Sequence, residues 1–371
     1  MRTEQIALPP LAPGIGLALT VHRFGEAGAR PQVYVQAALH ADETPGMLVA
    51  HHLRERLTAL EAEGRITGEI VLVPAANPIG LAQKVLGVPV GRFDLASGRN
   101  FNRGYPYLVP GVAERIAGRL TGQADANVAI IREALAAEVE AWDVSSSVDR
   151  LKATLLRLAV GADIVLDLHC DAEASMHLYT HTRTAEPFAS LGALLGVNAF
   201  LVADVSGDDP FDEASSRPWP ELASRFPDHP IPVACEAATL EFRGEADVDH
   251  ATARADAGAL VDYMILRGVI AGPMPAVPAP LCGPTPLAAS EPVVAPASGI
   301  IVFRAGIGER IEAGTIVAEI VDPTTGALTE VRTQAGGVVF ARALVRFATQ
   351  GQRIAKVAGT TAWRKGGLLG A

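Results

Sequence analysis

Two apolar segments that each end in a histidine constrain most strongly what this chain can fold into. Residues 33–39 read Val-Tyr-Val-Gln-Ala-Ala-Leu before His40, and residues 162–168 read Ala-Asp-Ile-Val-Leu-Asp-Leu before His169. Both have the length and apolar content of buried strands, and a helical pattern opens shortly after the first. Open α/β sheets bind ligands where strands end and helices begin. The two histidines are therefore predicted to lie at that edge of one sheet.

Glu43 adds a carboxylate to these two histidines, because His40-Ala-Asp-Glu43 falls on the same strand-to-helix turn. Two histidines and one carboxylate form a ligand set that catalytic zinc uses, with the fourth position left open. His40, Glu43 and His169 are predicted to bind one Zn²⁺ per chain, for which manganese or cobalt could substitute in vitro. The alternative for His169, taken alone, is a hydrogen-bonded core histidine.

The composition favours a compact globular enzyme. Of the 371 residues, 49% are hydrophobic and 19% are charged. The net charge of −10, with no long run of lysine or arginine, argues against nucleic acid or an anionic membrane as a partner. We find neither a signal-peptide layout nor an uncharged apolar stretch of the roughly 18 residues that span a membrane. Three widely spaced cysteines give no disulfide framework, and a cytoplasmic location is predicted.

Apolar runs alternate with helical patterns over the first 271 residues, which is typical of an α/β domain. Strands are expected near 17–23, 32–39, 68–76 and 162–169, and helices near 45–63, 112–142, 146–159 and 251–268. Beyond them, proline becomes too dense for a helix or a central strand. We predict a zinc-dependent catalytic domain at 1–271, a proline-rich linker at 272–288 and a β-rich domain at 289–371.

The C-terminal region contains an internal repeat. Ser298-Gly-Ile-Ile-Val-Phe-Arg and Gly314-Thr-Ile-Val-Ala-Glu-Ile are echoed by Gly336-Gly-Val-Val-Phe-Ala-Arg and Gly351-Gln-Arg-Ile-Ala-Lys-Val. The repeat predicts a small β-structure with pseudo-twofold symmetry. Its pattern resembles the barrel-sandwich fold of biotinyl and lipoyl carrier domains. A carrier needs a lysine on an exposed hairpin, but the first lysine here, Lys356, lies inside an expected strand, so a lid or assembly role is predicted.

A glycine-punctuated segment at 91–106 concentrates groups that bind anions. It carries Arg92, Arg99, Asn102 and Arg103. An arginine beside an amide matches a planar carboxylate, so Asn102 and Arg103 are predicted to bind substrate. Another arginine near the metal can stabilise the oxyanion formed when water adds to an amide. Arg92 and Arg99 are the two candidates for that role, Arg99 also for substrate binding; surface ion pairs are the alternative for all three arginines.

Glu241 lies in the apolar run Ala-Ala-Thr-Leu-Glu-Phe-Arg-Gly at 237–244. A carboxylate among apolar residues needs a partner or a raised pKa, and a raised pKa suits a general base near neutrality. Glu241 is predicted to take a proton from water and pass it to the leaving amine. Glu236 competes for this role, and an exposed position on an edge strand is the alternative. Asp167 is expected either to orient the His169 imidazole or to cap a helix.

Four short motifs resemble, in this order, those of the succinylglutamate desuccinylase/aspartoacylase family. They span residues 30–245 and are His40-x-x-Glu43, Asn102-Arg103, Asp167-Leu-His169 and Thr239-Leu-Glu241-Phe-Arg-Gly. The resemblance implies a carboxypeptidase-like mixed β-sheet flanked by helices, and hydrolysis of N-acyl amino acids. It also implies zinc on the two histidines and Glu43, Glu241 as general base and acid, and Asn102 with Arg103 at the substrate carboxylate.

The chain departs from the usual family pattern near these motifs. Ala41 replaces a common glycine, Asn-Phe-Asn-Arg replaces Asp-Leu-Asn-Arg, and the loop between Arg92 and Arg103 is longer. This longer form is similar to a bacterial branch that deacetylates N-acetyl-diaminobutyrate-type compounds. We predict a zinc-dependent amidohydrolase for a small N-acyl amino acid. The alternatives are a zinc carboxypeptidase for short peptides, or a binding or carrier protein with a vestigial zinc site. The protein could form a homo-oligomer in each case.

Overall fold

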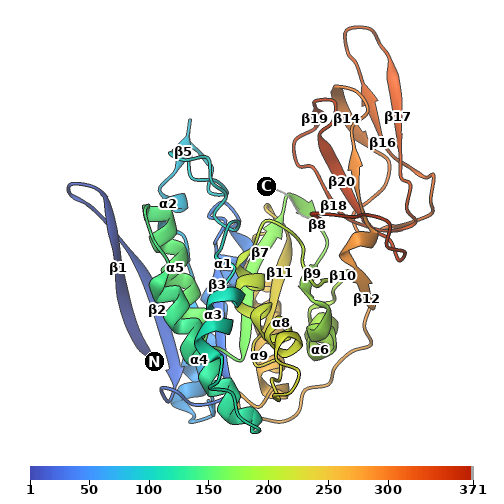
Figure 1. The fold of residues 1–371 in the computed structure, drawn as a ribbon. Helices are drawn as coiled ribbons and strands as arrows, with labels where there is room; N and C mark the ends of the chain where they lie inside the picture. Colours follow the sequence, from blue (N-terminus) through green and yellow to red (C-terminus); the bar gives the residue numbers. More distant parts are fainter. Residues whose placement is uncertain (369–371) are drawn as a thin grey trace.

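One large mixed β-sheet organises the computed structural model, which describes residues 1–368 (Figure 1). In spatial order its strands are β1 (Arg2–Ala12), β2 (Ile15–Gly25), β4 (Glu69–Val73), β3 (Gln32–Ala37), β7 (Ile164–Asp171), β11 (Glu236–Gly244), β9 (His177–His181), β10 (Ala199–Ala203) and β12 (Pro284–Pro286). The central strands β4, β3, β7 and β11 are parallel, whereas β2 and β9 pair with them in the antiparallel sense. This sheet confirms the predicted α/β class.

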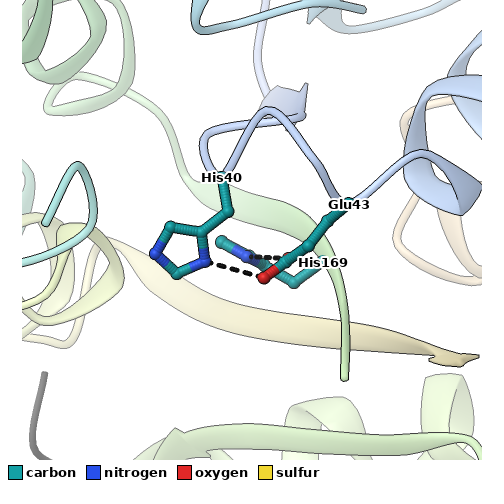
Figure 2. Close-up of side chains that lie close together, drawn as sticks. All are labelled: His40, Glu43 and His169. Carbon is teal, nitrogen blue, oxygen red and sulfur yellow. Dashed lines mark hydrogen bonds and ion pairs between the residues drawn. The ribbon is translucent and has the colours of Figure 1, made fainter. Parts of the chain in front are cut away.

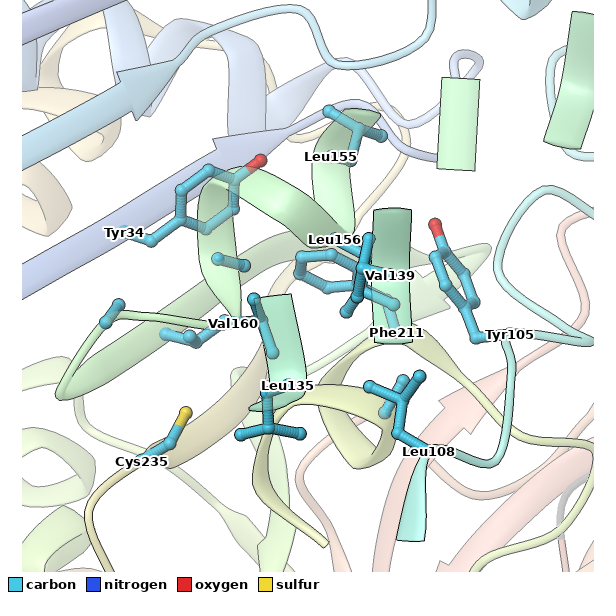
Figure 3. Close-up of a cluster of buried hydrophobic side chains, with 14 of the residues drawn as sticks. Tyr34, Tyr105, Leu108, Leu135, Val139, Leu155, Leu156, Val160, Phe211 and Cys235 are labelled. Carbon is cyan, nitrogen blue, oxygen red and sulfur yellow. The ribbon is translucent and has the colours of Figure 1, made fainter. Parts of the chain in front are cut away.

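Helices cover both faces of the sheet because its central strands are apolar on both sides. Tyr34 packs on one face in a cluster that Figure 3 shows, and the neighbouring Val33 packs on the other. The first face holds α3 (Val109–Ile116), α4 (Ala124–Ala141), α5 (Ser147–Ala159), α7 (Phe211–Ser216) and α8 (Pro218–Arg225). The second holds α1 (Pro45–Ala62), α6 (Ala185–Leu195) and α9 (His250–Leu266).

The elements differ from the expected ones in three places. The helix expected at 112–142 is broken into α3 and α4 near Gly118, whose φ of +73° a helix cannot continue. The N-terminal β1–β2 hairpin was not anticipated; its prolines at 9 and 10 lie in an outermost strand, where a missing N–H is tolerated. The expected linker at 272–288 ends in β12, which pairs with β10 as the opposite outer strand of the sheet.

Residues 290–358 form two smaller antiparallel sheets that enclose their own apolar core. One contains β13 (Ser290–Val294), β20 (Arg353–Ala358), β18 (Gly337–Arg342) and β15 (Arg310–Ile311). The other contains β17 (Leu328–Arg332), β16 (Ile316–Val321), β14 (Gly299–Phe303) and β19 (Phe347–Ala348). The repeat is visible here, because β14 and β16 of one unit correspond to β18 and β20 of the other. The short strand of each unit pairs with a strand of the other unit: β15 pairs with β18, and β19 pairs with β14.

The C-terminal β-structure contacts the region of the large sheet directly, in addition to being connected to it through the chain. The short strand β8 (Glu173–Ala174), just after β7, pairs with β18 (Figure 1). Glu173 accepts hydrogen bonds from Arg342 and Arg346, and Lys356 forms an ion pair with Asp171. These contacts hold the C-terminal strands beside the end of β7. Within residues 1–368, no helix has the length and apolar character needed to cross a membrane.

Candidate metal centre and substrate pocket

Strand register brings the predicted metal ligands together. β3 and β7 are adjacent and parallel, with Ala37 opposite Leu168, so His40 and His169 follow at the same edge of the sheet. Glu43 lies in the turn into α1, which packs closely on β7: a Cβ at Gly46 would lie 2.9 Å from the Leu168 carbonyl oxygen. Glycine at this position therefore allows the start of α1, and with it Glu43, to approach the end of β7.

The three side chains meet through complementary atoms (Figure 2). Nδ1 of His40 lies 2.8 Å from one Glu43 carboxylate oxygen, and Nδ1 of His169 lies 2.7 Å from the other. On the far side of each ring, Nε2 of His40 is 2.9 Å from the Asn100 side-chain oxygen, and Nε2 of His169 is 2.9 Å from Asp167. Both outer partners are acceptors, so Nε2 of each ring is placed to donate to them, which leaves Nδ1 of each ring as the atom that would coordinate a metal.

This donor set fits a divalent transition metal. Two imidazole rings and a carboxylate converge, and the guanidinium of Arg92 lies beside them, with its Nη1 2.8 Å from Glu43. Burial lowers the pKa of His40 to about 4, which keeps the ring in its neutral, ligating form. Although burial opposes both shifts, the charges of Asp167 and Glu43 raise the pKa of His169 well above its usual value, and the two histidines hold the pKa of Glu43 well below its usual range. A metal that binds here would therefore replace a proton on His169. The cluster has the ligand types of a zinc site.

Asn100 is an outer partner that the sequence did not single out. Its side-chain oxygen accepts from His40 Nε2 and from the backbone N–H of Asn102. Lys152, fully buried in α5, supports the same loop by donating to the carbonyl oxygens of Asn100 and Arg103, at 3.1 and 2.5 Å. The loop is thereby fixed from both sides, and the His40 ring with it.

We expect Asn100→Ala to weaken metal binding by roughly 10- to 100-fold, the usual effect of losing a partner that orients a ligating histidine. The variant leaves the Nε2–H of His40 without its acceptor, so the ring can rotate away from Glu43. Chelator competition would measure the dissociation constant, with Asn198→Ala, at a half-buried asparagine beside β10, as the control. An unchanged metal affinity in Asn100→Ala would show that Asn100 does not position His40.

The cluster lines a pocket that contains four further predicted residues, Arg92, Asn102, Arg103 and Glu241. The Asn102 side-chain nitrogen lies 3.4 Å from His169 Nε2. Arg103 donates from Nη1 to the Asn102 carbonyl oxygen at 2.7 Å, whereas its buried Nε has no partner among residues 1–368. An arginine with unused donors, facing a pocket, is suited to bind an anion.

Arg99 and Glu236, two other candidates from the sequence, are not among the residues that line this pocket. Arg99 is 40% exposed and forms a 2.7 Å ion pair with Asp149, and it does not line the pocket described within residues 1–368. This geometry favours Arg92 over Arg99 at the metal. Glu236 begins β11 at the opposite end of the strand and pairs with Arg267.

Glu241 occupies the position expected of a general base. It faces His169 in the register between β11 and β7 and lines the pocket. Its Oε2 is buried, with no hydrogen-bond partner among the described residues. Burial, and then the negative charge of Glu43, raise the pKa of Glu241 to about 8. The carboxyl group can therefore exchange a proton near neutral pH.

Much of the rest of the pocket wall comes from residues that were not among the predicted site residues. β9 contributes Tyr179, Thr180 and His181, β10 contributes Leu201 and Ala203, and α7 contributes Asp212, Glu213 and Ser216. Leu287, which follows β12, also lines the pocket. This part of the lining is thus built from distant parts of the chain, and it combines apolar and acidic groups.

Comparisons with known proteins agree with this geometry. Residues 29–218 match the family model described as the succinylglutamate desuccinylase/aspartoacylase catalytic domain. Two crystal structures of proteins described as belonging to this family, from Shewanella amazonensis SB2B and Shewanella frigidimarina NCIMB 400, each match with a TM-score of 0.84 and 28% identity. They cover 96% of this chain and 98% and 97% of their own chains.

A more distant match is the product-bound ectoine utilization protein EutE (DoeB) from Ruegeria pomeroyi, with 17% identity and a TM-score of 0.66 over 97% of this chain and 95% of that one. This match supports the fold alone. The search of curated proteins gives no significant match. The family model covers just over half of the 371 residues and includes all three residues of the His40–Glu43–His169 cluster. The chain belongs to the succinylglutamate desuccinylase/aspartoacylase family of hydrolases.

Proposed function

We propose that this protein is a zinc-dependent deacylase that hydrolyses the amide bond of a small N-acyl amino acid. The observation that carries the proposal is the meeting, in one pocket, of the His40–Glu43–His169 cluster with the buried carboxyl group of Glu241. Membership of a hydrolase family supports the same chemistry.

The pocket residues Glu241, Arg92, Asn102 and Arg103 each have a role in the proposed reaction. Bound zinc would polarise the amide carbonyl and make water more acidic. Glu241 removes the proton from the attacking water and delivers it to the amine that leaves. The Arg92 guanidinium, beside Glu43, supplies positive charge where the carbonyl oxygen becomes negative. Arg103, held by Asn102, binds the substrate carboxylate and so fixes the amide relative to Glu241.

The peptidase and carrier alternatives receive less support. The pocket has a volume of about 70 Å³, and Leu201 and Leu287 are among its lining residues, which favours a small substrate over an extended peptide. Lys356 forms an ion pair with Asp171 where the C-terminal strands contact the region of the large sheet, whereas a carrier lysine lies on an exposed hairpin. The C-terminal strands are better suited to shaping the surroundings of the pocket.

The test is the release of free amine from a panel of N-acetyl, N-succinyl and N-formyl amino acids and of blocked dipeptides, each with and without a chelator. We expect chelator-sensitive hydrolysis of a small N-acyl amino acid. Cleavage of dipeptides alone would instead establish a peptidase. A zinc-loaded protein that hydrolyses no member of the panel would contradict the deacylase proposal.

A further inference from the structure

A second, larger cavity adjoins the catalytic pocket at Arg92, which lines both. It lies between the end of β7 and the C-terminal strands, and its volume is about 690 Å³, against about 70 Å³ for the catalytic pocket. A third cavity, which shares Glu213 with the catalytic pocket, has a volume of only about 10 Å³. A substrate that extends beyond the catalytic pocket therefore finds most room on the Arg92 side.

The C-terminal strands give this larger cavity, here called the C-terminal groove, an exposed apolar surface. Val294, Leu344 and Val345 line it, and their exposed fractions are 45%, 43% and 65%. Val294 ends β13, and the other two lie in the connection between β18 and β19. Apolar side chains that stay exposed in one groove are typical of a binding site for an apolar ligand group.

The charged groups of the C-terminal groove balance one another. Four of its six charged residues are held in ion pairs, which are Lys356–Asp171, Arg342–Glu173 and Arg92–Glu43. The two other charged residues that line it, Glu245 and Arg353, are opposite in sign. The groove therefore has no excess charge that would select an anionic or a cationic ligand group.

The roles proposed for the catalytic residues determine which part of a substrate would reach this groove. Arg103 is assigned to the carboxylate of the amino acid, and Arg92 to the carbonyl oxygen of the amide. An amide is planar and trans, so its acyl substituent and the α-carbon of the amino acid point in opposite directions. The acyl substituent is thus directed away from Arg103, toward the side where Arg92 borders the groove.

We propose that the C-terminal groove binds the acyl chain of the substrate, and that the enzyme prefers an apolar acyl chain of several carbons over an acetyl group. The inference rests on the proposed deacylase function and adds the class of acyl group. Each methylene group that leaves water against Val294, Leu344 and Val345 strengthens binding. A peptide in the same place would need hydrogen-bond partners for its N–H and C=O groups, which these three side chains do not offer.

A series of acyl groups on one amino acid tests this preference. N-acetyl, N-butanoyl, N-hexanoyl and N-octanoyl derivatives of alanine, aspartate and lysine are compared, so that the amino acid does not decide the result. We expect kcat/KM of the zinc-loaded protein to rise roughly two- to fourfold for each added methylene group as far as hexanoyl, the effect of moving a methylene group out of water.

Two further acyl groups separate an apolar chain from other occupants of the groove. Adipoyl has the length of hexanoyl but ends in a carboxylate, and acetyl-leucyl makes the substrate a blocked dipeptide. Both are expected to be poorer than hexanoyl. A kcat/KM that is highest for acetyl, adipoyl or acetyl-leucyl would overturn the inference.

Leu344→Asp assigns the preference to the C-terminal groove. It places a charge among the exposed apolar side chains, so we expect the ratio of kcat/KM for hexanoyl to that for acetyl to fall toward one. Val345→Asp, at the most exposed of the three positions, should do the same.

Leu328→Asp is the matched control for these variants. Leu328 is a 57% exposed leucine on β17, in the same C-terminal part of the chain, and it is not among the described residues that line the groove. The control should keep the wild-type ratio. If Leu344→Asp and Val345→Asp keep it too, or if the control loses it equally, the acyl chain does not bind in this groove.

Binding of the released acid separates this inference from the proposed function. Hexanoate and acetate are titrated calorimetrically into the zinc-loaded protein and into Leu344→Asp, which requires no turnover. Tighter binding of hexanoate that is lost in the variant supports the acyl site even if none of the amides is cleaved. Hydrolysis without any gain from longer acyl chains, or equal binding of the two acids, would overturn the inference and leave the deacylase proposal intact.

Discussion

Glu241→Gln is expected to lower kcat for amide hydrolysis by roughly 10²- to 10⁴-fold, the range for loss of a positioned acid–base group. Glutamine keeps the size of the side chain but cannot accept the proton of the attacking water. Because Glu241 is not one of the residues that meet at the proposed metal site, metal content is expected to stay at the wild-type level. The measurement combines steady-state kinetics with metal analysis of the same sample.

Glu236→Gln is the matched control for that variant. Glu236 lies on the same strand, but it pairs with Arg267 at the opposite end, so its kcat is expected to stay near that of the wild type. If Glu241→Gln retained full turnover, the general base would have to be another group. If it lost activity together with the metal, a structural effect on the site would be indicated instead.

His169→Ala is expected to reduce metal affinity by more than the roughly 10- to 100-fold typical of losing an outer partner, because it removes a ligand itself. Activity should fall with metal content. The buried carboxylate of Glu43 would also lose its 2.7 Å contact with the imidazole, so a drop in thermal stability is expected. Metal analysis after dialysis, together with a melting curve, checks both effects.

His51→Ala is the control for this second variant. His51 belongs to another His/Glu group, with His52 and Glu55 on α1, but its side chain is 44% exposed. Removing it should leave both catalytic activity and the tightly bound metal unchanged. Full metal occupancy in His169→Ala, or loss of the tightly bound metal in His51→Ala, would mean that the metal is bound elsewhere than at the strand ends.

The sequence could predict that the three candidate metal ligands lie together, because their arrangement follows from local pattern. His40 and His169 each end an apolar run, and adjacent parallel strands bring such ends to one edge of a sheet. Glu241 lies in a third run of this kind, and the same register places it opposite His169. A side chain at the end of a strand could therefore be placed without knowledge of distant contacts.

The part of the pocket that α7 lines could not be predicted in this way. Asp212 lies there because the backbone N–H of the neighbouring Phe211 is hydrogen-bonded to the side chain of Asn102, more than a hundred residues earlier in the chain. Arg99 and Arg92 lie in one polar segment, and their contacts with distant residues, Arg99 with Asp149 and Arg92 with Glu43, distinguish them. The break near Gly118 did have a local signal, a glycine inside the expected helix. The positions of Asp212, Arg92 and Arg99 are instead determined by contacts between distant segments, and not by residue preferences.

The most direct test of a metal-dependent deacylase is the rate of amine release by metal-free protein as zinc is added back. The account predicts negligible activity without metal, followed by a rise that reaches its plateau near one equivalent of zinc per chain, with no such rise in His169→Ala. Full activity in thoroughly metal-free protein would contradict the account, because the two histidines and Glu43 would then not support catalysis through a bound ion.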